Sequence, residues 1–181
     1  MLKRTMAVLF IAILATAAAG FAASDLQAYS YDWSGGHDAA GATAPSDTWY
    51  FAEGCTRPGF DCWLCVMNPQ AQPATLDISF LTPAGAEFQR TATVAPLSRY
   101  TLNVADVVGT GQDVSMLLTS DLAVVAERPM YFNYHANLAG GHDAAGATAP
   151  SDTWYFAEGC TRPGFDCWLC VMNPQAQPAT L

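Results

Sequence analysis

The cysteines are the residues of this sequence whose type and spacing most directly suggest chemistry. They form two identical triplets, Cys55, Cys62 and Cys65, then Cys160, Cys167 and Cys170. A Cys-x-x-Cys pair invites a zinc or redox interpretation. Along a strand, however, successive side chains point to opposite faces, which would separate Cys62 from Cys65. A structural zinc ion also takes four ligands where each triplet offers three. The spacing therefore predicts no metal site.

Spaced cysteines in an exported protein form disulfides by default. Cys55 and Cys62 bracket a turn-rich loop at residues 56–61, and a bridge closing so small a ring is worth about 2.5 kcal/mol of chain entropy. We therefore predict two bridges, Cys55–Cys62 and Cys160–Cys167. Cys65 is then left over, either buried as a small apolar residue or paired with Cys170.

Histidines and aromatic residues are the other candidates for a site. His37, His135 and His142 all lie in Gly/Ala-rich sequence that offers neither a packed shell nor an oriented nucleophile, so we predict no enzyme and no cofactor. Trp49 and Trp63 are a possible platform on which a sugar ring stacks. Alternation favours core packing for the aromatic run at 49–51, because its side chains would be buried on both faces.

These residues are carried by an exact internal repeat. The stretch Gly35 to Leu76 recurs letter for letter as Gly140 to Leu181, at an offset of 105 residues. A period of that length matches one β-sandwich domain. The chain therefore reads as one complete unit followed by the opening of a second, and that opening is too short to fold alone.

The N-terminal segment has the three parts of a secretory signal peptide. Lys3 and Arg4 precede an apolar run from 6 to 19, and small residues follow. The alternative, an uncleaved anchor, needs about 20 apolar residues. We expect cleavage after Ala19 or Ala22. Removing two of the seven basic residues leaves five against 16 acidic ones, a net charge of −11, which disfavours nucleic-acid binding.

The remaining sequence alternates short apolar-polar runs with turns and shows no helical period. We predict strands near residues 48–52, 62–67, 76–82, 88–94, 100–104, 114–119, 122–126 and 130–134, with 114–126 forming a hairpin around Ser120-Asp121. This pattern of about seven strands per repeat predicts an all-β fold, an immunoglobulin-like antiparallel β-sandwich whose second repeat is truncated. A jelly roll or a small barrel would give a similar string.

The motif order resembles a tandem β-sandwich repeat of secreted and cell-surface bacterial proteins. The resemblance rests on Thr48-Trp49-Tyr50-Phe51-Ala52-Glu53-Gly54, then Ala126-Glu127-Arg128-Pro129-Met130-Tyr131-Phe132, with Gly-Gly-His-Asp linking the units. It implies a β-sandwich repeat in a large extracellular protein and brings no catalytic residues with it.

The predicted organisation is a signal peptide at 1–22, a degenerate strand and Gly/Ala-rich linker at 23–44, a complete repeat at 45–134, a linker at 135–149 and a truncated repeat at 150–181. The predicted function is that of a non-catalytic extracellular structural or interaction module. The alternative is a carbohydrate-binding module that uses exposed aromatics. We expect partners among other repeats, cell-surface proteins or polysaccharide, and membrane contact only during export. We predict a monomer, with a strand-swapped oligomer as the alternative.

Overall fold

The computed structural model describes residue 37, residues 39–134 and residues 138–181. The signal peptide predicted at 1–22 and the degenerate strand predicted at 28–33 lie outside the described residues. Eight strands and one short helix are described. In chain order they are β1 (Ser46–Phe51), β2 (Phe60–Asn68), β3 (Ala74–Leu81), β4 (Glu87–Val94), β5 (Ser98–Asn103), α2 (Ala105–Val108), β6 (Ser115–Glu127), β7 (Met130–Tyr134) and β8 (Leu138–His142).

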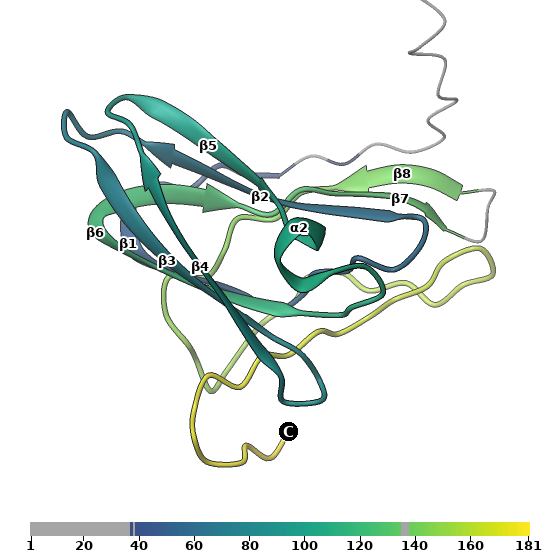
Figure 1. Ribbon diagram of the computed structural model, residues 1–181. Coiled ribbons are helices and arrows are strands. Elements are labelled where there is room, and N and C mark those ends of the chain that lie inside the picture. The colour runs from purple at the N-terminus through teal and green to yellow at the C-terminus, as the bar shows by residue number, and fades with distance from the viewer. Residues whose placement is uncertain (1–36, 38, 135–137) are drawn as a thin grey trace, which may run out of the picture. The chain divides into compact units, whose positions relative to one another are not determined.

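The strands pair antiparallel in two groups that are joined through β6 (Figure 1). In the first group, β6 lies between β1 and β3, and β4 pairs with the far edge of β3. In the second group, β2 lies between β5 on one side and β6 and β7 on the other, and β8 pairs with β7. The result is the all-β, sandwich-like antiparallel fold that the alternating sequence predicts.

The core is formed by the inward-facing residues of these strands. In β3, every second residue from Ala74 to Phe80 is buried, which is the alternation expected of a strand with one face against the core. In β2, Cys62, Leu64 and Val66 are buried, whereas Trp63 and Cys65 are half-buried on the opposite face. The predicted separation of Cys62 from Cys65 is therefore confirmed.

The expected hairpin at 114–126 is wrong. The structure has a single strand, β6, of 13 residues through Ser120 and Asp121. Its first half pairs with β1 and β3, and its second half, from Val125 to Glu127, pairs with β2. The pair Ser120-Asp121 contains neither glycine nor proline, and the Asp121 carboxylate accepts a hydrogen bond from the backbone N–H of Thr75 at 2.7 Å. This side-chain contact holds Asp121 against β3 instead of in a turn.

The stretch 135–149, expected as a linker, contains β8 and further backbone pairings. We call Leu138–Thr148 the junction segment. Its strand β8 pairs with β7 from Met130↔His142 to Tyr134↔Leu138. The sequence expectation failed here because glycine and alanine were taken as signals of a flexible connection, whereas in this fold they allow close packing against aromatic rings.

The second copy of the repeated sequence forms no strand between Ser151 and Leu181. No described helix is long and apolar enough to cross a membrane.

Candidate functional site: the junction over Trp49

The candidate site is the place where the junction segment returns to the first strand of the repeat. Ala147 pairs with Tyr50 of β1 through two backbone hydrogen bonds of 2.8 and 2.9 Å. The backbone N–H of Arg128 donates to the Ala144 carbonyl at 2.9 Å, and Ala145 bridges Glu127. The junction segment therefore covers the edge of β1, which would otherwise present unpaired backbone groups.

Trp49 is the side chain around which this site is built. It is 1% exposed, and its indole N–H is shared between the carbonyl oxygens of Ser46 at 3.2 Å and Val124 at 3.1 Å. Val124 lies on β6, so this bond links Trp49 of β1 to the second half of β6. A buried indole N–H needs such an acceptor, because an unpaired one would lose its hydration without compensation.

Three glycines of the junction segment lie against aromatic rings. A Cβ built on Gly146 would be 2.8 Å from Cζ of Phe51 and 3.1 Å from Cε3 of Trp49. On β8, a Cβ on Gly140 would be 3.1 Å from the ring of Phe132, and one on Gly141 would be 3.1 Å from Cδ1 of Tyr131. Each contact is shorter than an ordinary carbon-carbon contact of about 3.5–4.0 Å. A Cβ on Gly146 would therefore overlap the Phe51 ring, whereas at Gly140 and Gly141 the rings of Phe132 and Tyr131 would have to shift by a few tenths of an ångström.

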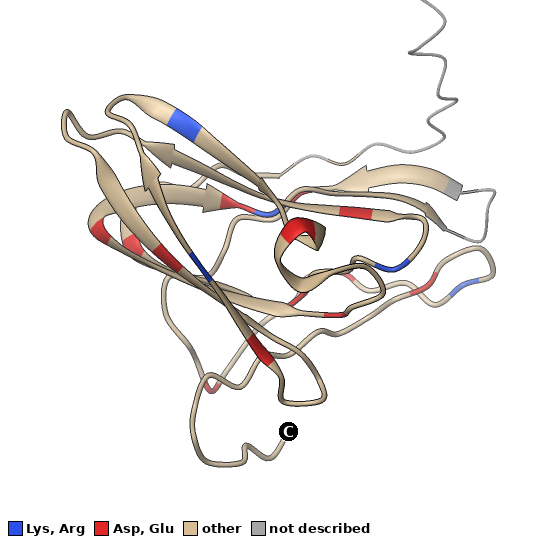
Figure 2. Cartoon of the chain, viewed as in Figure 1, with Lys and Arg blue, Asp and Glu red and all other residues tan. Residues whose placement is uncertain are grey.

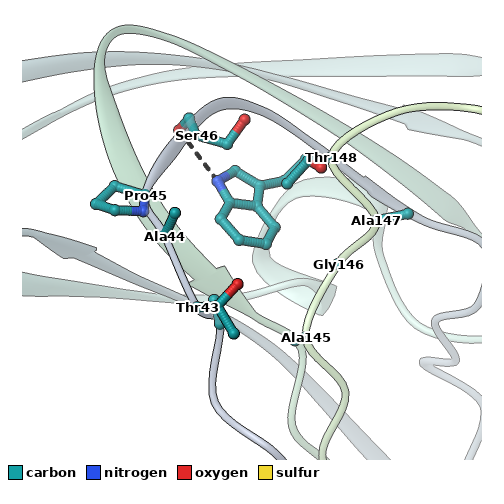
Figure 3. Close-up of a pocket in the computed structure, with 10 residues that line it drawn as sticks. Thr43, Ala44, Pro45, Ser46, Ala145, Gly146, Ala147 and Thr148 are labelled. Carbon is teal, nitrogen blue, oxygen red and sulfur yellow. Dashed lines mark hydrogen bonds between the residues drawn. The ribbon is translucent and has the colours of Figure 1, made fainter.

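A cavity of about 420 Å³ opens beside the indole. Figure 3 shows Thr43 to Ser46 on one side of it and Ala145 to Thr148 on the other, with the dashed bond running to Ser46. The two sides share one stretch of the repeated sequence, because Ala42-Thr43 and Ala147-Thr148 are equivalent positions of the repeat. The chain thus enters and leaves the repeat at one place, and small side chains line both paths.

A group of polar side chains lies near the same junction. Arg128 is buried and its Nη2 is 3.2 Å from a carboxylate oxygen of Glu53, whose side chain is 38% exposed. Nε and Nη1 of Arg128 have no hydrogen-bond partner among the described residues. The guanidinium therefore depends on Glu53 for its counter-charge.

His37 and His142, which occupy equivalent positions of the repeat, meet at this junction. Their ring centroids are 4.4 Å apart, and the backbone N–H of Asp143 donates to Nδ1 of His37 at 3.2 Å. Burial, then the charge of Arg128, then His37 itself lower the pKa of His142. The neutral imidazole is the form that this packing favours.

The sequence-predicted cysteine bridges are absent from the structure. All six cysteines are free thiols, with Cys55 and Cys62 buried in the core. Cys55 forms a β-bridge with Asp113, and its backbone also hydrogen-bonds the thiol of Cys62. Burial raises the pKa of the Cys62 thiol to about 11. Cys160 and Cys167 lie in the second copy, where Cys160 is half-buried and Cys167 is exposed.

Cys65 and Cys170 have different surroundings. Cys65 is half-buried, with its sulfur 3.8 Å from the Thr101 hydroxyl. Cys170 lies in the exposed second copy, and burial followed by the charge of Glu53 raises the pKa of its thiol. Among the described ranges, no group of three or more His, Cys, Asp or Glu side chains is placed to hold a metal ion.

The two tryptophans proposed as a sugar platform lie in different environments. Trp49 is enclosed in the core, as the alternation predicts. Trp63 is half-buried on the outer face of β2, where its backbone N–H donates to the carbonyl of Pro129 at 2.9 Å. Tyr131, 46% exposed, lies on β7 opposite Asp61, two residues before Trp63. The outer face of β2 and β7 therefore carries two aromatic side chains that reach the surface.

Charge is spread thinly over the described chain. The basic residues of the described chain are all arginines, and in Figure 2 they occur singly along the ribbon among more numerous Asp and Glu. The described part of the chain therefore presents no continuous basic patch of the kind that holds a phosphate backbone.

The sequence interpretation missed the junction segment. Its signal was present as the glycines at 140, 141 and 146, but the aromatic rings they face are set by strand pairing and by the return of the chain to β1. Trp49 and Trp63 were identified from the sequence as a possible sugar platform. The structure places Trp49 in the core and Trp63 on the outer face of β2.

Comparisons with known proteins locate the fold but not the activity. No family model and no curated protein matches the chain. Among solved structures, the crystal structure of Thermotoga maritima 1070 matches with a TM-score of 0.53 at 18% identity, over 57% of this chain and 94% of that one. The Anabaena sensory rhodopsin transducer matches with a TM-score of 0.43 at 16% identity, over 46% of this chain and 87% of that one. At this identity, the first likeness shows the fold alone.

Proposed function

We propose that this protein is a non-catalytic structural or interaction repeat module of a secreted or cell-surface bacterial protein. The observation that carries the proposal is the junction over Trp49, where the segment leaving the repeat is bonded back onto the first strand of the same repeat. A unit closed in this way keeps its own edge covered and is suited to serial repetition. The acidic composition fits a solvated extracellular surface.

The position of the two chain ends favours presentation of surfaces over resistance to tension. Ser46 and Thr148 line one cavity, so the ends of the repeat leave from the same edge. Force applied to these two ends would break the hydrogen bonds between Ala147 and Tyr50 one after the other, in an unzipping geometry. A repeat with this geometry holds its remaining loops toward a partner, which we expect to be another repeat, a surface protein or a polysaccharide.

Force spectroscopy on the full chain, held by its two ends, tests this closed unit. We expect unfolding at low force, with release of the roughly 100 residues between Ser46 and Ala147, or about 350 Å of extended chain. Release of a shorter length that leaves out residues 138–147 would show that the junction segment is not part of the unit. High resistance would contradict the presenting role.

Export is tested separately, by fractionating bacteria that produce the full chain. The proposal expects the protein outside the cytoplasm with an N-terminus following Ala19 or Ala22. Retention in the cytoplasm with Met1 intact would contradict the extracellular assignment. For the exported form we also propose a Cys55–Cys62 disulfide, since both thiols belong to one buried cluster and oxidising compartments favour such bridges. Mass mapping under non-reducing conditions decides between the bridge and two free thiols.

Carbohydrate binding is the second candidate function, favoured by Trp63 and Tyr131 on the outer face of β2 and β7. Aromatic rings at a strand surface can stack on sugar rings, and Tyr131 is 46% exposed. The test is retention of the full chain on insoluble cell-wall glycan, chitin and cellulose. Under this candidate, Trp63→Ala abolishes retention, whereas Trp168→Ala, the same residue in the second copy, leaves it unchanged. Equal retention of both variants, or no retention of the wild type, removes carbohydrate binding as a function.

A further inference from the structure

The two copies of the repeated sequence share their local structure. In both, the tryptophan indole donates to the carbonyl three residues earlier, at 3.2 Å for Trp49 and 3.0 Å for Trp154. The threonine N–H also donates to the serine hydroxyl two residues earlier in both, at 3.3 Å for Thr48 and 3.2 Å for Thr153. Further along, Asn68 and Asn173 each donate to a carbonyl four residues later at 2.8 Å. The second copy is therefore locally prepared for the conformation of the first.

The tertiary surroundings of the two copies differ completely. Trp49 is 1% exposed and Phe51 4%, whereas their counterparts Trp154 and Phe156 are 56% and 68% exposed. Only Trp49 has the second indole bond, to Val124 on β6. The second copy thus displays a hexapeptide with three exposed aromatic residues, 151–156, that has the same sequence as β1 but pairs with no strand among the described residues.

We propose that the position of β1 on β6 is a binding slot for which Ser46–Phe51 and Ser151–Phe156 of the same chain compete. The slot is defined by the pairing of β1 with β6, from Thr48↔Thr119 to Phe51↔Met116, and by the core pocket that takes Trp49 and Phe51. Because the two hexapeptides are identical, every contact that β1 makes with β6 is available to the second copy. The slot therefore does not distinguish between them by chemistry.

The second hexapeptide is attached within reach of the slot. Thr148 lines the same cavity as Ser46, where β1 begins. Ser151 follows Thr148 by three residues, which span up to about 10 Å. The exchange needs only the displacement of β1, which is preceded by no other described strand, while β2 and β3 stay in place.

The junction segment determines which copy occupies the slot. Ala147 lies four residues before Ser151, so residues 151–156 can enter the slot only if Ala147 releases its two bonds to Tyr50 and Gly146 leaves the Phe51 ring. These contacts favour the first copy, and the exchanged state is a minor one, on the order of 0.1–10%. Weakening the junction should raise this population.

Cysteine trapping in the full chain tests the slot. Thr48 and its β6 partner Thr119 are at the sheet surface, so T48C/T119C should cross-link readily and mark the normal state. T153C/T119C should form the corresponding bridge more slowly, at a rate independent of protein concentration. A176C/T119C, with a cysteine elsewhere in the second copy, is the control. Peptide mapping distinguishes these bridges from those of the native cysteines.

The outcomes separate the proposal from its alternatives. Adding G146A to T153C/T119C should raise the cross-linking rate several-fold, whereas adding G41A should not. A T153C/T119C rate no higher than that of A176C/T119C would overturn the proposal. A rate that increases with protein concentration would also overturn it, because the occupant would then come from a second chain.

Discussion

Substitution of Gly146 by alanine is the perturbation that most directly probes the junction. The added Cβ would lie 2.8 and 2.9 Å from Cζ and Cε1 of Phe51, about 0.7–1 Å inside an ordinary carbon-carbon contact. Phe51 is buried and held by β6, so its ring has little room to move. The junction segment must therefore lift, which strains the bonds between Ala147 and Tyr50. Overpacking of this kind costs about 1–3 kcal/mol.

The repeat provides a matched control in Gly41. It has the same sequence neighbours as Gly146, but a Cβ there meets nothing within 4 Å. Both substitutions reduce the freedom of the unfolded chain in the same way, an effect of about 0.4–1 kcal/mol that favours folding. The difference between the two variants therefore isolates the contact with Phe51 and should be about 1–3 kcal/mol.

Urea unfolding followed by tryptophan fluorescence measures this difference. We expect Gly146→Ala to lower the midpoint relative to wild type, and Gly41→Ala to leave it unchanged or raise it slightly. In thermal melts each kcal/mol should shift the Tm by about 4–8 °C. If the free energies of unfolding of the two variants agreed within about 0.5 kcal/mol, the close contact between Gly146 and Phe51 would be refuted as a source of stability.

Three further predictions concern ionisable groups. Cys62 has a folded pKa of about 11 against an ordinary value of 9.0, so the folded state favours the neutral thiol. This contribution to the free energy of unfolding, about 2–3 kcal/mol in full, is present below about pH 9 and is lost as pH rises to about 11. Under reducing conditions, Cys62→Ala should therefore flatten the alkaline fall in the urea midpoint. Glu53→Gln leaves the buried Arg128 without its counter-charge and should destabilise the protein by about 1–3 kcal/mol in urea unfolding, whereas Glu158→Gln, its second-copy equivalent, should change nothing. The pKa of His142 is lowered in the folded state, so stability present above the ordinary value of 6.5 should decrease as pH falls below it; an unchanged acid slope in the His142→Gln variant would contradict this.

The strands were predictable because their signals are local. In β3, alternating apolar residues from Ala74 to Phe80 face the core, as the sequence indicates. The turn at Pro83-Ala84-Gly85 is likewise local, because proline and glycine favour turns and Gly85 adopts a positive φ of 80°. Burial of Trp49 followed from the same alternation.

The junction was not predictable in the same way. Whether Gly140, Gly141 and Gly146 form a flexible connection or a closely packed one depends on whether aromatic rings lie beneath them. Phe132 and Tyr131 reach the first two only because β7 pairs with β8, and Phe51 reaches the third only because the chain returns to β1. The continuity of β6 was missed for a related reason, since its two halves have different partners.

The exact repeat separates what the sequence determines from what the fold decides. Turn geometry is determined by sequence alone: Gly59 and Gly164 have φ values of 87° and 89°, and the asparagine and tryptophan bonds recur in both copies. Strand formation is not determined by sequence alone, because residues 46–51 form β1 while the identical residues 151–156 form no strand. The physical reason is that a turn satisfies its own backbone groups within a few residues, whereas a strand needs the N–H and C=O groups of a neighbour. For the first copy that neighbour is β6, and only the tertiary structure determines which copy pairs with it.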